Sequence, residues 1–234
     1  MLFTLGNPKT AKGEARGYLT AVLHLAPADT AGLGNVCPRA TAGCKAVCLN
    51  TAGRGGIFAR GATTNAIQEA RKRRTAQYFA DRTAFEAELD ADLARLWRTA
   101  ARKGLALAVR VNGTSDLPGL ARRLAQWWPH VQFYDYTKIE RPWERELPNY
   151  HLTFSRAERN GIAVTDAMFK GINVAVVFST RRGQALPETW LGKPVIDGDK
   201  HDLRFLDPRG VVVGLRAKGR ARKDTSGFVV QVGG

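Results

Sequence analysis

The hydrophobic positions of residues 62–104 recur with the period of an α-helix. An apolar stripe with three- and four-residue spacing runs along the second half of this segment: Phe85, Leu89, Leu93, Leu96 and Trp97. Acidic residues come before basic residues here, an order that suits the helix dipole, and Gly104 marks a helix end. The pattern predicts two helices, one from a capping signal at Thr64 to Phe79 and a second that buries its stripe, Trp97 included.

After residue 104 the period changes, and short apolar runs alternate with polar loops. Six runs have the composition of strands: L-A-L-A-V-R-V, V-Q-F-Y-D-Y, H-L-T-F-S, I-N-V-A-V-V-F, K-P-V-I-D-G and V-V-V-G-L-R-A. Their starts recur about every 16 to 26 residues, which is the βα rhythm of a parallel sheet or barrel. Six strands are too few for a complete eight-fold barrel. Strands before the cysteines, such as Tyr18 to Leu25, would contribute to it.

These elements predict one α/β domain over residues 1–234, with the form of a partial or distorted TIM-like (βα) barrel. It comprises an N-terminal segment with a cysteine loop (1–61), a helical pair (62–104) and a series of βα units (105–234). A chain of 234 residues has ample material for a hydrophobic core, and no long linker divides it.

Each predicted strand after residue 104 runs into polar residues at its carboxyl end. These are Asn112, Ser115 and Asp116; Asp135, Tyr136, Thr137 and Lys138; Ser155 and Arg156; Ser179 and Thr180; and Asp197, Asp199, Lys200 and Asp202. Parallel α/β proteins build their sites at this edge of the sheet, so we expect a site there. The spacing of the last three aspartates matches no calcium loop. We expect them to orient Lys200 and Arg204 or to form ion pairs.

All three cysteines of the chain, Cys37, Cys44 and Cys48, lie close together in a CX6CX3C arrangement. Three thiols cannot all pair as disulfides, and thiolates held together in a glycine-rich loop are the donors that a soft metal centre needs. A structural zinc usually takes four protein ligands. A 4Fe–4S cluster with three protein-bound irons matches the count better and leaves one iron open to a substrate or cofactor. Loss of that iron would leave a 3Fe–4S cluster.

Two other interpretations of the cysteines stay open. His24, in the apolar stretch A-V-L-H-L, could complete a Cys3His zinc site, although a lone histidine there is more typical of the core. Isolated cysteines are also commonly small buried hydrophobes. Such residues would be scattered along the chain, and Pro38 and Gly43 would have no reason to lie between them.

The formal charge of the chain is +15, from 36 Lys and Arg against 21 Asp and Glu. This excess favours a polyanionic partner such as nucleic acid. The main basic groups are residues 71–74, 122–123, 181–182 and 214–223, each typical of a solvated surface when taken alone. No zinc-finger, RNA-recognition or helix-turn-helix signature accompanies them. No membrane span or signal peptide is recognisable, so we expect a cytoplasmic location and no membrane partner.

Several motifs together resemble the gene-product-88 family of phage and prophage proteins. They are N-V-C-P-R-A-T-A-G-C-K-A-V-C-L-N-T-A-G-R, V-N-G-T-S-D, Y-D-Y-T-K, H-L-T-F-S-R and V-I-D-G-D-K-H-D-L-R-F-L-D-P, and they extend over most of the chain. The resemblance implies a viral or prophage origin, and hence the cytoplasm of an infected or lysogenic bacterial host.

More distantly, the chain resembles radical S-adenosylmethionine enzymes, which also place three cysteines in a loop before a partial βα barrel. This resemblance implies that the three cysteines ligate a four-iron cluster, although those enzymes space them as CX3CX2C. Their Gly-Gly-Glu segment, which grips the methionine part of S-adenosylmethionine, corresponds in place to N-G-T-S-D here. Asn112, Ser115 and Asp116 would then be partners of the amine and carboxylate of that cofactor.

The leading hypothesis is a phage-type iron–sulfur protein that is a radical- or redox-type enzyme, with its cluster at the barrel mouth. Candidate catalytic residues are Lys138, Asp199 and Lys200, candidate cofactor-binding residues are Asn112, Ser115, Asp116 and Tyr136, and Tyr134 is a further candidate for substrate contact. The expected partners are an unidentified small molecule or electron donor. The alternative is a non-catalytic nucleic-acid-binding protein with a structural iron–sulfur or zinc site, in which the basic surface carries the function.

Overall fold

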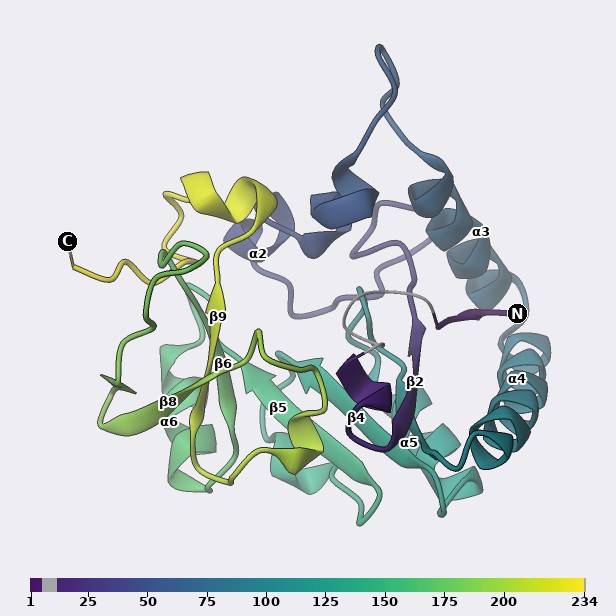
Figure 1. Cartoon of the computed structure of the whole chain (residues 1–234). Coiled ribbons are helices and arrows are strands. Elements are labelled where there is room, and N and C mark those ends of the chain that lie inside the picture. Colours follow the sequence, from purple (N-terminus) through teal and green to yellow (C-terminus); the bar gives the residue numbers. More distant parts are fainter. Residues whose placement is uncertain (6–11, 234) are drawn as a thin grey trace.

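The structure, a computed structural model, describes residues 1–5 and 12–233 (Figure 1). Its centre is a nine-stranded sheet in the order β1-β2-β3-β4-β5-β6-β9-β8-β7. β1 and β7 run antiparallel to their neighbours, and the other neighbouring strands are parallel. The strands are β1 (Phe3–Thr4), β2 (Tyr18–Leu23), β3 (Ala106–Arg110), β4 (Gln132–Thr137), β5 (Tyr150–Ser155), β6 (Val174–Phe178), β7 (Thr189–Trp190), β8 (Lys193–Asp197) and β9 (Val212–Arg216).

Helices connect most of the parallel strands. They are α2 (Ala42–Ala46), α3 (Ala66–Ala80), α4 (Arg82–Arg102), α5 (Pro118–Trp127) and α6 (Gly161–Phe169), with short 3-10 helices η1 (Leu49–Thr51), η2 (Gly53–Gly56), η3 (Pro142–Glu144), η4 (Arg204–Leu206) and η5 (Gly219–Lys223). Within the described part of the chain, no helix combines the length and the apolar character that crossing a bilayer requires.

The predicted α/β class and strand series are confirmed. Each of the six apolar runs after residue 104 contains a strand, and β2 is the earlier strand expected near Tyr18. Because β2 to β6 lie side by side in chain order and are parallel, their carboxyl ends meet at one edge of the sheet. The sheet of the described residues is not closed, since β1 and β7 lie at its two ends. The partial-barrel form stays a prediction.

One face of the sheet is packed against α4 and α5, and the stripe of α4 behaves as predicted with one exception. Phe85 and the three leucines of the stripe are at most 2% exposed. Burial of each of these side chains stabilises the fold by about 2 kcal/mol relative to leaving it exposed. Asp81 caps the helix by accepting a hydrogen bond from Ala84 N, and Gly104, with φ +66°, follows its end. The prediction for Trp97 is wrong, because its side chain is 44% exposed. Trp97 follows Leu96 by one residue, so its indole points away from the buried stripe. It packs edge-on against His130 at the surface.

The other face of the sheet is crossed by residues 198–207. Phe205 packs against Tyr18 and Tyr134 at ring-centroid distances of 5.1 and 5.5 Å. These two tyrosines belong to this face because successive residues of a strand point to opposite sides. Arg204 is fully buried beside them and pairs with Asp207 at 3.1 Å. This segment therefore covers part of this face of the sheet. It leaves the part at the carboxyl ends of the strands open for the site.

The aspartates after β8 form ion pairs, which was one of the two roles predicted for them. Asp197 and Asp199 pair with Arg216 at 3.0 and 3.4 Å, and Asp202 pairs with Arg110 at 3.1 Å. Arg216 belongs to β9, the strand next to β8, whereas Arg110 belongs to β3, which lies farther along the sheet, so residues 198–207 connect distant strands across this face.

Candidate functional site

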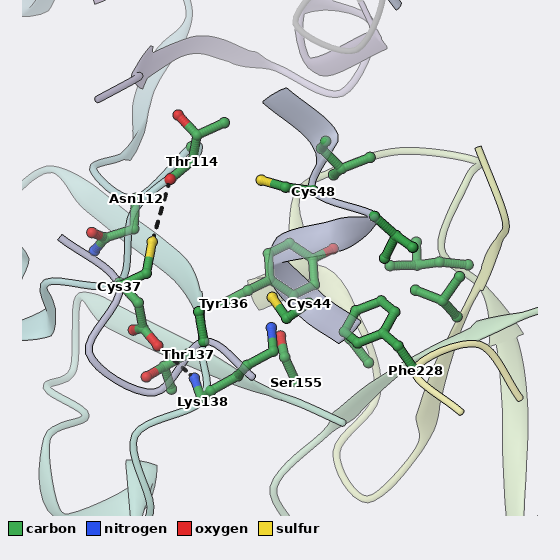
Figure 2. A pocket seen from close by; sticks show the side chains of 18 of the residues that line it. Cys37, Cys44, Cys48, Asn112, Thr114, Tyr136, Thr137, Lys138, Ser155 and Phe228 are labelled. Carbon is green, nitrogen blue, oxygen red and sulfur yellow. Dashed lines mark hydrogen bonds between the residues drawn. The ribbon is translucent and has the colours of Figure 1, made fainter. Parts of the chain in front are cut away.

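A cavity of about 220 Å³ lies at the carboxyl ends of the parallel strands. All three cysteines line it, and Figure 2 shows their sulfurs directed toward its interior. The strand ends contribute polar walls from several elements: Arg110 at the end of β3, Asn112, Ser115 and Asp116 after it, Tyr136, Thr137 and Lys138 at β4, Ser155 and Arg156 at β5, and Arg216 at β9. The structure therefore brings the cysteine loop and the strand-end polar residues to one place.

Each cysteine is held by a different local structure. Cys37 lies in an extended loop, where its sulfur accepts a hydrogen bond from Ala28 N at 3.2 Å and donates to Thr114 O at 3.6 Å. Cys44 lies on α2, and its peptide N donates to the hydroxyl of Thr41, the N-cap of that helix. Cys48 precedes η1. The short helices α2 and η1 thus present two thiols to the cavity, and the preceding loop presents the third.

Glu158, in the loop after β5, fixes the start of α2. Its Oε1 accepts a hydrogen bond from Gly43 N at 2.8 Å, and its Oε2 accepts one from the Thr41 hydroxyl at 2.7 Å. A Cβ on Gly43 would lie 2.9 Å from the carboxyl carbon of Glu158 and would also clash with Ser226. The glycine before Cys44 is therefore required by close packing against the β5 loop and the C-terminal segment.

Replacing Glu158 by glutamine should keep α2 in place but weaken the hydrogen bonds to it, while alanine should remove both. We expect Glu158→Ala to lose about 2 kcal/mol of unfolding free energy, because two hydrogen bonds to a carboxylate are lost. Urea denaturation of both variants measures this. An alanine variant as stable as the parent protein would show that the clamp does not hold α2.

Burial sets the protonation of the thiols when no metal is bound. It raises the pKa of Cys37 to about 11 and also raises the pKa of Cys48. Thiolates in such a place need a cation close by, and metal ions supply it. Among the described residues, no group of three or more His, Cys, Asp or Glu side chains is arranged to hold a single metal ion. The donors that the cavity offers to a soft metal centre are thus the three thiols that line it.

His24 does not join the thiols. It lies outside the residues that line the cavity. Burial, together with Arg71, Arg110 and Arg74, lowers the pKa of His24 to about 3, so the imidazole stays neutral. The geometry agrees with the interpretation of His24 as a core residue.

Asn112 and Ser115 line the cavity but use their polar groups within the protein. The Asn112 peptide N and Nδ2 donate to Asp135 at 2.7 and 2.9 Å, and Tyr150 OH donates to the same carboxylate at 3.2 Å. The Asn112 Oδ1 accepts from Ser115 Oγ at 2.9 Å and from Leu117 N at 2.8 Å. This network fixes the loop after β3. Asp135, one of the strand-end residues expected at the site, does not line the cavity and instead anchors this loop through these hydrogen bonds.

Asp116 and Tyr136 bring unused polar atoms to the cavity wall. Asp116 Oδ2 accepts a hydrogen bond from Lys138 N at 2.7 Å, whereas its buried Oδ1 has no hydrogen-bond partner among the described residues. Burial raises the pKa of Asp116. The buried hydroxyl of Tyr136 also lacks a partner there, and the Arg110 guanidinium lies 4.7 Å from the Tyr136 ring centroid. Both residues offer hydrogen-bonding capacity to a ligand.

The three candidate catalytic residues are separated. Lys138 lines the cavity and its ammonium lies 5.6 Å from the ring centroid of Phe228 (Figure 2). Asp199 and Lys200 lie outside the lining, and Asp199 is engaged with Lys218 and Arg216. Of the three, only Lys138 is in position to touch a group bound beside the thiols.

Sequence reasoning missed several residues of the site. Arg110 ends a predicted strand and could have been included among the strand-end polar residues. Glu158 and Phe228 carry no local signal, because their roles depend on how the β5 loop and the C-terminal segment meet α2.

The comparisons with known proteins give one match. No curated protein and no solved structure matches the chain. The family model described as gene product 88 matches residues 1–232, almost the whole chain. The chain therefore belongs to the gene product 88 family.

Proposed function

We propose that this protein binds an iron–sulfur cluster through Cys37, Cys44 and Cys48. The observation that carries the proposal is that the only three thiols of the chain line one cavity at the carboxyl edge of a parallel sheet. Three thiols are one fewer than the four protein ligands that a structural zinc usually takes, and His24 does not line the cavity, so the donor set favours a cluster over a lone zinc ion. A cluster spreads its ligating sulfurs over several irons, which suits thiols around a common space.

We further propose that the bound cluster serves a redox or radical reaction in the host cytoplasm. A 4Fe–4S cluster held by three thiolates supplies electrons or a Lewis-acidic iron at its open position. The residues that line the cavity would orient the substrate or cofactor that binds at the open iron. Lys138 provides a positive charge, and Asp116 and Tyr136 provide hydrogen-bonding atoms. Asp199 reaches the cavity only indirectly, through its ion pairs with the lining residues Arg216 and Lys218.

Metal analysis of anaerobically purified protein tests the proposal. We expect brown protein with about four irons and about four acid-labile sulfides per chain. Colourless protein with one zinc per chain would support the alternative, a protein with a structural zinc site and a nucleic-acid-binding surface.

S-adenosylmethionine is the cofactor that the distant resemblance suggests for the open iron, and a partial barrel is the fold that goes with it. If it binds, its addition to the reduced protein should change the electron paramagnetic resonance spectrum and give slow release of deoxyadenosine. An unchanged spectrum at saturating S-adenosylmethionine, with no deoxyadenosine, would contradict this cofactor and leave the cluster for electron transfer with an external donor.

The alternative function has support of its own in the charge of +15. A non-catalytic nucleic-acid-binding protein should bind DNA or RNA tightly at low salt. Its affinity for the nucleic acid should fall steeply as the salt concentration rises, because binding releases counterions. It should also bind equally well without its metal, provided that the fold is intact. Titration of labelled strands at several salt concentrations measures this.

A further inference from the structure

The cavity offers more than a metal site, because its walls carry hydrogen-bonding atoms that nothing in the protein uses. Asp116 Oδ1, Tyr136 OH and Arg110 Nε are buried and have no hydrogen-bond partner among the described residues. Asp116 is 8% exposed and lines the cavity together with Tyr136 and Arg110. Buried polar groups are normally paired. These atoms therefore fit a ligand with several donors and acceptors along one edge.

Another part of the cavity lining is apolar and carries an aromatic ring. Val47, Val177, Leu215 and Ala221 line it beside Phe228. Arg156 Nη1 donates to the carbonyl oxygens of Gly227 and Phe228 at 2.5 and 2.7 Å, so the backbone that carries this ring is held in place. An aromatic ring and hydrogen-bonding groups in one cavity are the combination that holds a base taken out of a nucleic-acid strand.

The rim of the cavity is basic. Figure 1 shows α2 next to the yellow η5, which follows the carboxyl end of β9. Cavity-lining residues of these segments are flanked by exposed cations: Arg39 follows Pro38 beside Ala40, Lys45 follows Cys44, and Arg220 and Arg222 flank Ala221. Lys45 pairs with Asp29 at 3.4 Å, whereas no ion pair is found for Arg39, Arg220 or Arg222 within the described chain. Such a rim suits a phosphodiester backbone.

We propose that the substrate of this site is one nucleotide of a single-stranded nucleic acid. The strand backbone lies on the basic rim, and the base enters the cavity between Phe228 and the edge formed by Asp116 and Tyr136. Its position is then beside the three thiols. That the bound nucleotide is a substrate rests on the proposed function, because the cluster on the three thiols would act on it. Binding of the nucleotide does not itself require the cluster.

The test compares two fluorescein-labelled strands of about 12 nucleotides, one bearing bases and one fully abasic, which have the same phosphate charge. RNA and DNA versions run in parallel show which sugar the site takes. We expect the base-bearing strand to bind about tenfold tighter than the abasic strand, since stacking contributes to each inserted base. A duplex should bind more weakly than the single strand. Equal affinity for base-bearing and abasic strands, or preference for the duplex, would overturn the proposal.

Variants separate the cavity from the rim. Phe228→Leu keeps an apolar side chain and should reduce the preference for the base-bearing strand to about twofold or less. The double variant Arg220→Ala/Arg222→Ala should weaken both strands alike and lower the salt slope by about 1.4, because two phosphate contacts are lost. The matched control, Arg98→Ala/Arg102→Ala on the outer surface of α4, should change neither. Equal losses in the rim and control variants would overturn the placement of the strand.

Iron content, assayed on the same samples, separates this inference from the proposed function. Protein without iron that still prefers the base-bearing strand would refute the cluster and support the nucleotide. Iron-loaded protein without that preference would support the cluster and refute the nucleotide.

Discussion

Serine in place of any one of Cys37, Cys44 or Cys48 should leave the protein with less than about a tenth of the parent iron content after anaerobic purification. The chain has no other thiol to replace the lost ligand. A cluster held by two thiolates dissociates more readily, because metal binding and the folding of the cysteine loop stabilise each other. Iron and acid-labile sulfide assays, with the visible spectrum, measure the effect.

The matched control for these variants is Ser155→Ala. Ser155 lines the same cavity but is no cluster ligand in this account, so its loss should leave the iron content unchanged. Parent-level iron in all three cysteine variants would show that the iron, if present, is bound elsewhere. Full iron in only one of them would remove that cysteine from the ligand set.

Replacing Asp135 by alanine should have the largest effect on stability among the polar residues near the site. The substitution removes the acceptor of three hydrogen bonds, from the Asn112 peptide N, Asn112 Nδ2 and Tyr150 OH, and leaves these buried donors unpaired. We expect a loss of about 3 to 5 kcal/mol of unfolding free energy, measured by urea denaturation. The exposed Asp166→Ala on α6 is the control and should change stability by less than about 0.5 kcal/mol. A loss from Asp135→Ala no larger than this would contradict the anchoring role.

The same carboxylate should make stability depend on pH. Burial raises the pKa of Asp135 to about 7 in the folded protein, above its value in the unfolded chain. The folded state then holds more protons between these two values, so the contribution of Asp135 to stability is present below about pH 4 and is lost as the pH rises toward 7. Asp135→Asn removes this titration and should flatten the stability profile in that window. An unchanged slope in the asparagine variant would assign the titration to another group.

The sequence predicted those parts of the molecule that depend on local pattern. The apolar runs after residue 104 became strands, the stripe of α4 became core, and Gly104 follows the end of that helix, because period and turn chemistry act over a few residues. The convergence of strand-end residues with the cysteines was also predicted, since parallel strands bring their ends to one edge. Asp199 and Lys200 do not line the cavity, and Asp199 instead forms ion pairs with Arg216 and Lys218, two residues that do line it.

The remaining features depend on contacts between distant segments. Trp97 follows the stripe by one residue, and a rotation of about 100 degrees per residue is enough to place it at the surface. Glu158 holds α2 across more than a hundred residues of sequence. Phe228 reaches the cavity from the C-terminal segment, in the short apolar run F-V-V that follows the basic residues 214–223. Such contacts follow from the assembled sheet and its loops, which no local pattern encodes.

The central claim is that three thiolates hold a cluster with one iron left open, and Mössbauer spectroscopy of the protein reconstituted with iron-57 tests it most directly. The account predicts the signature of a four-iron cluster with one iron site distinguishable from the other three, and a shift of that site alone when a small ligand such as cyanide is added. A three-iron cluster that converts to this form with added ferrous iron would agree with the same ligand set. Iron-57 absent from the protein, or bound as single ions, would contradict the account.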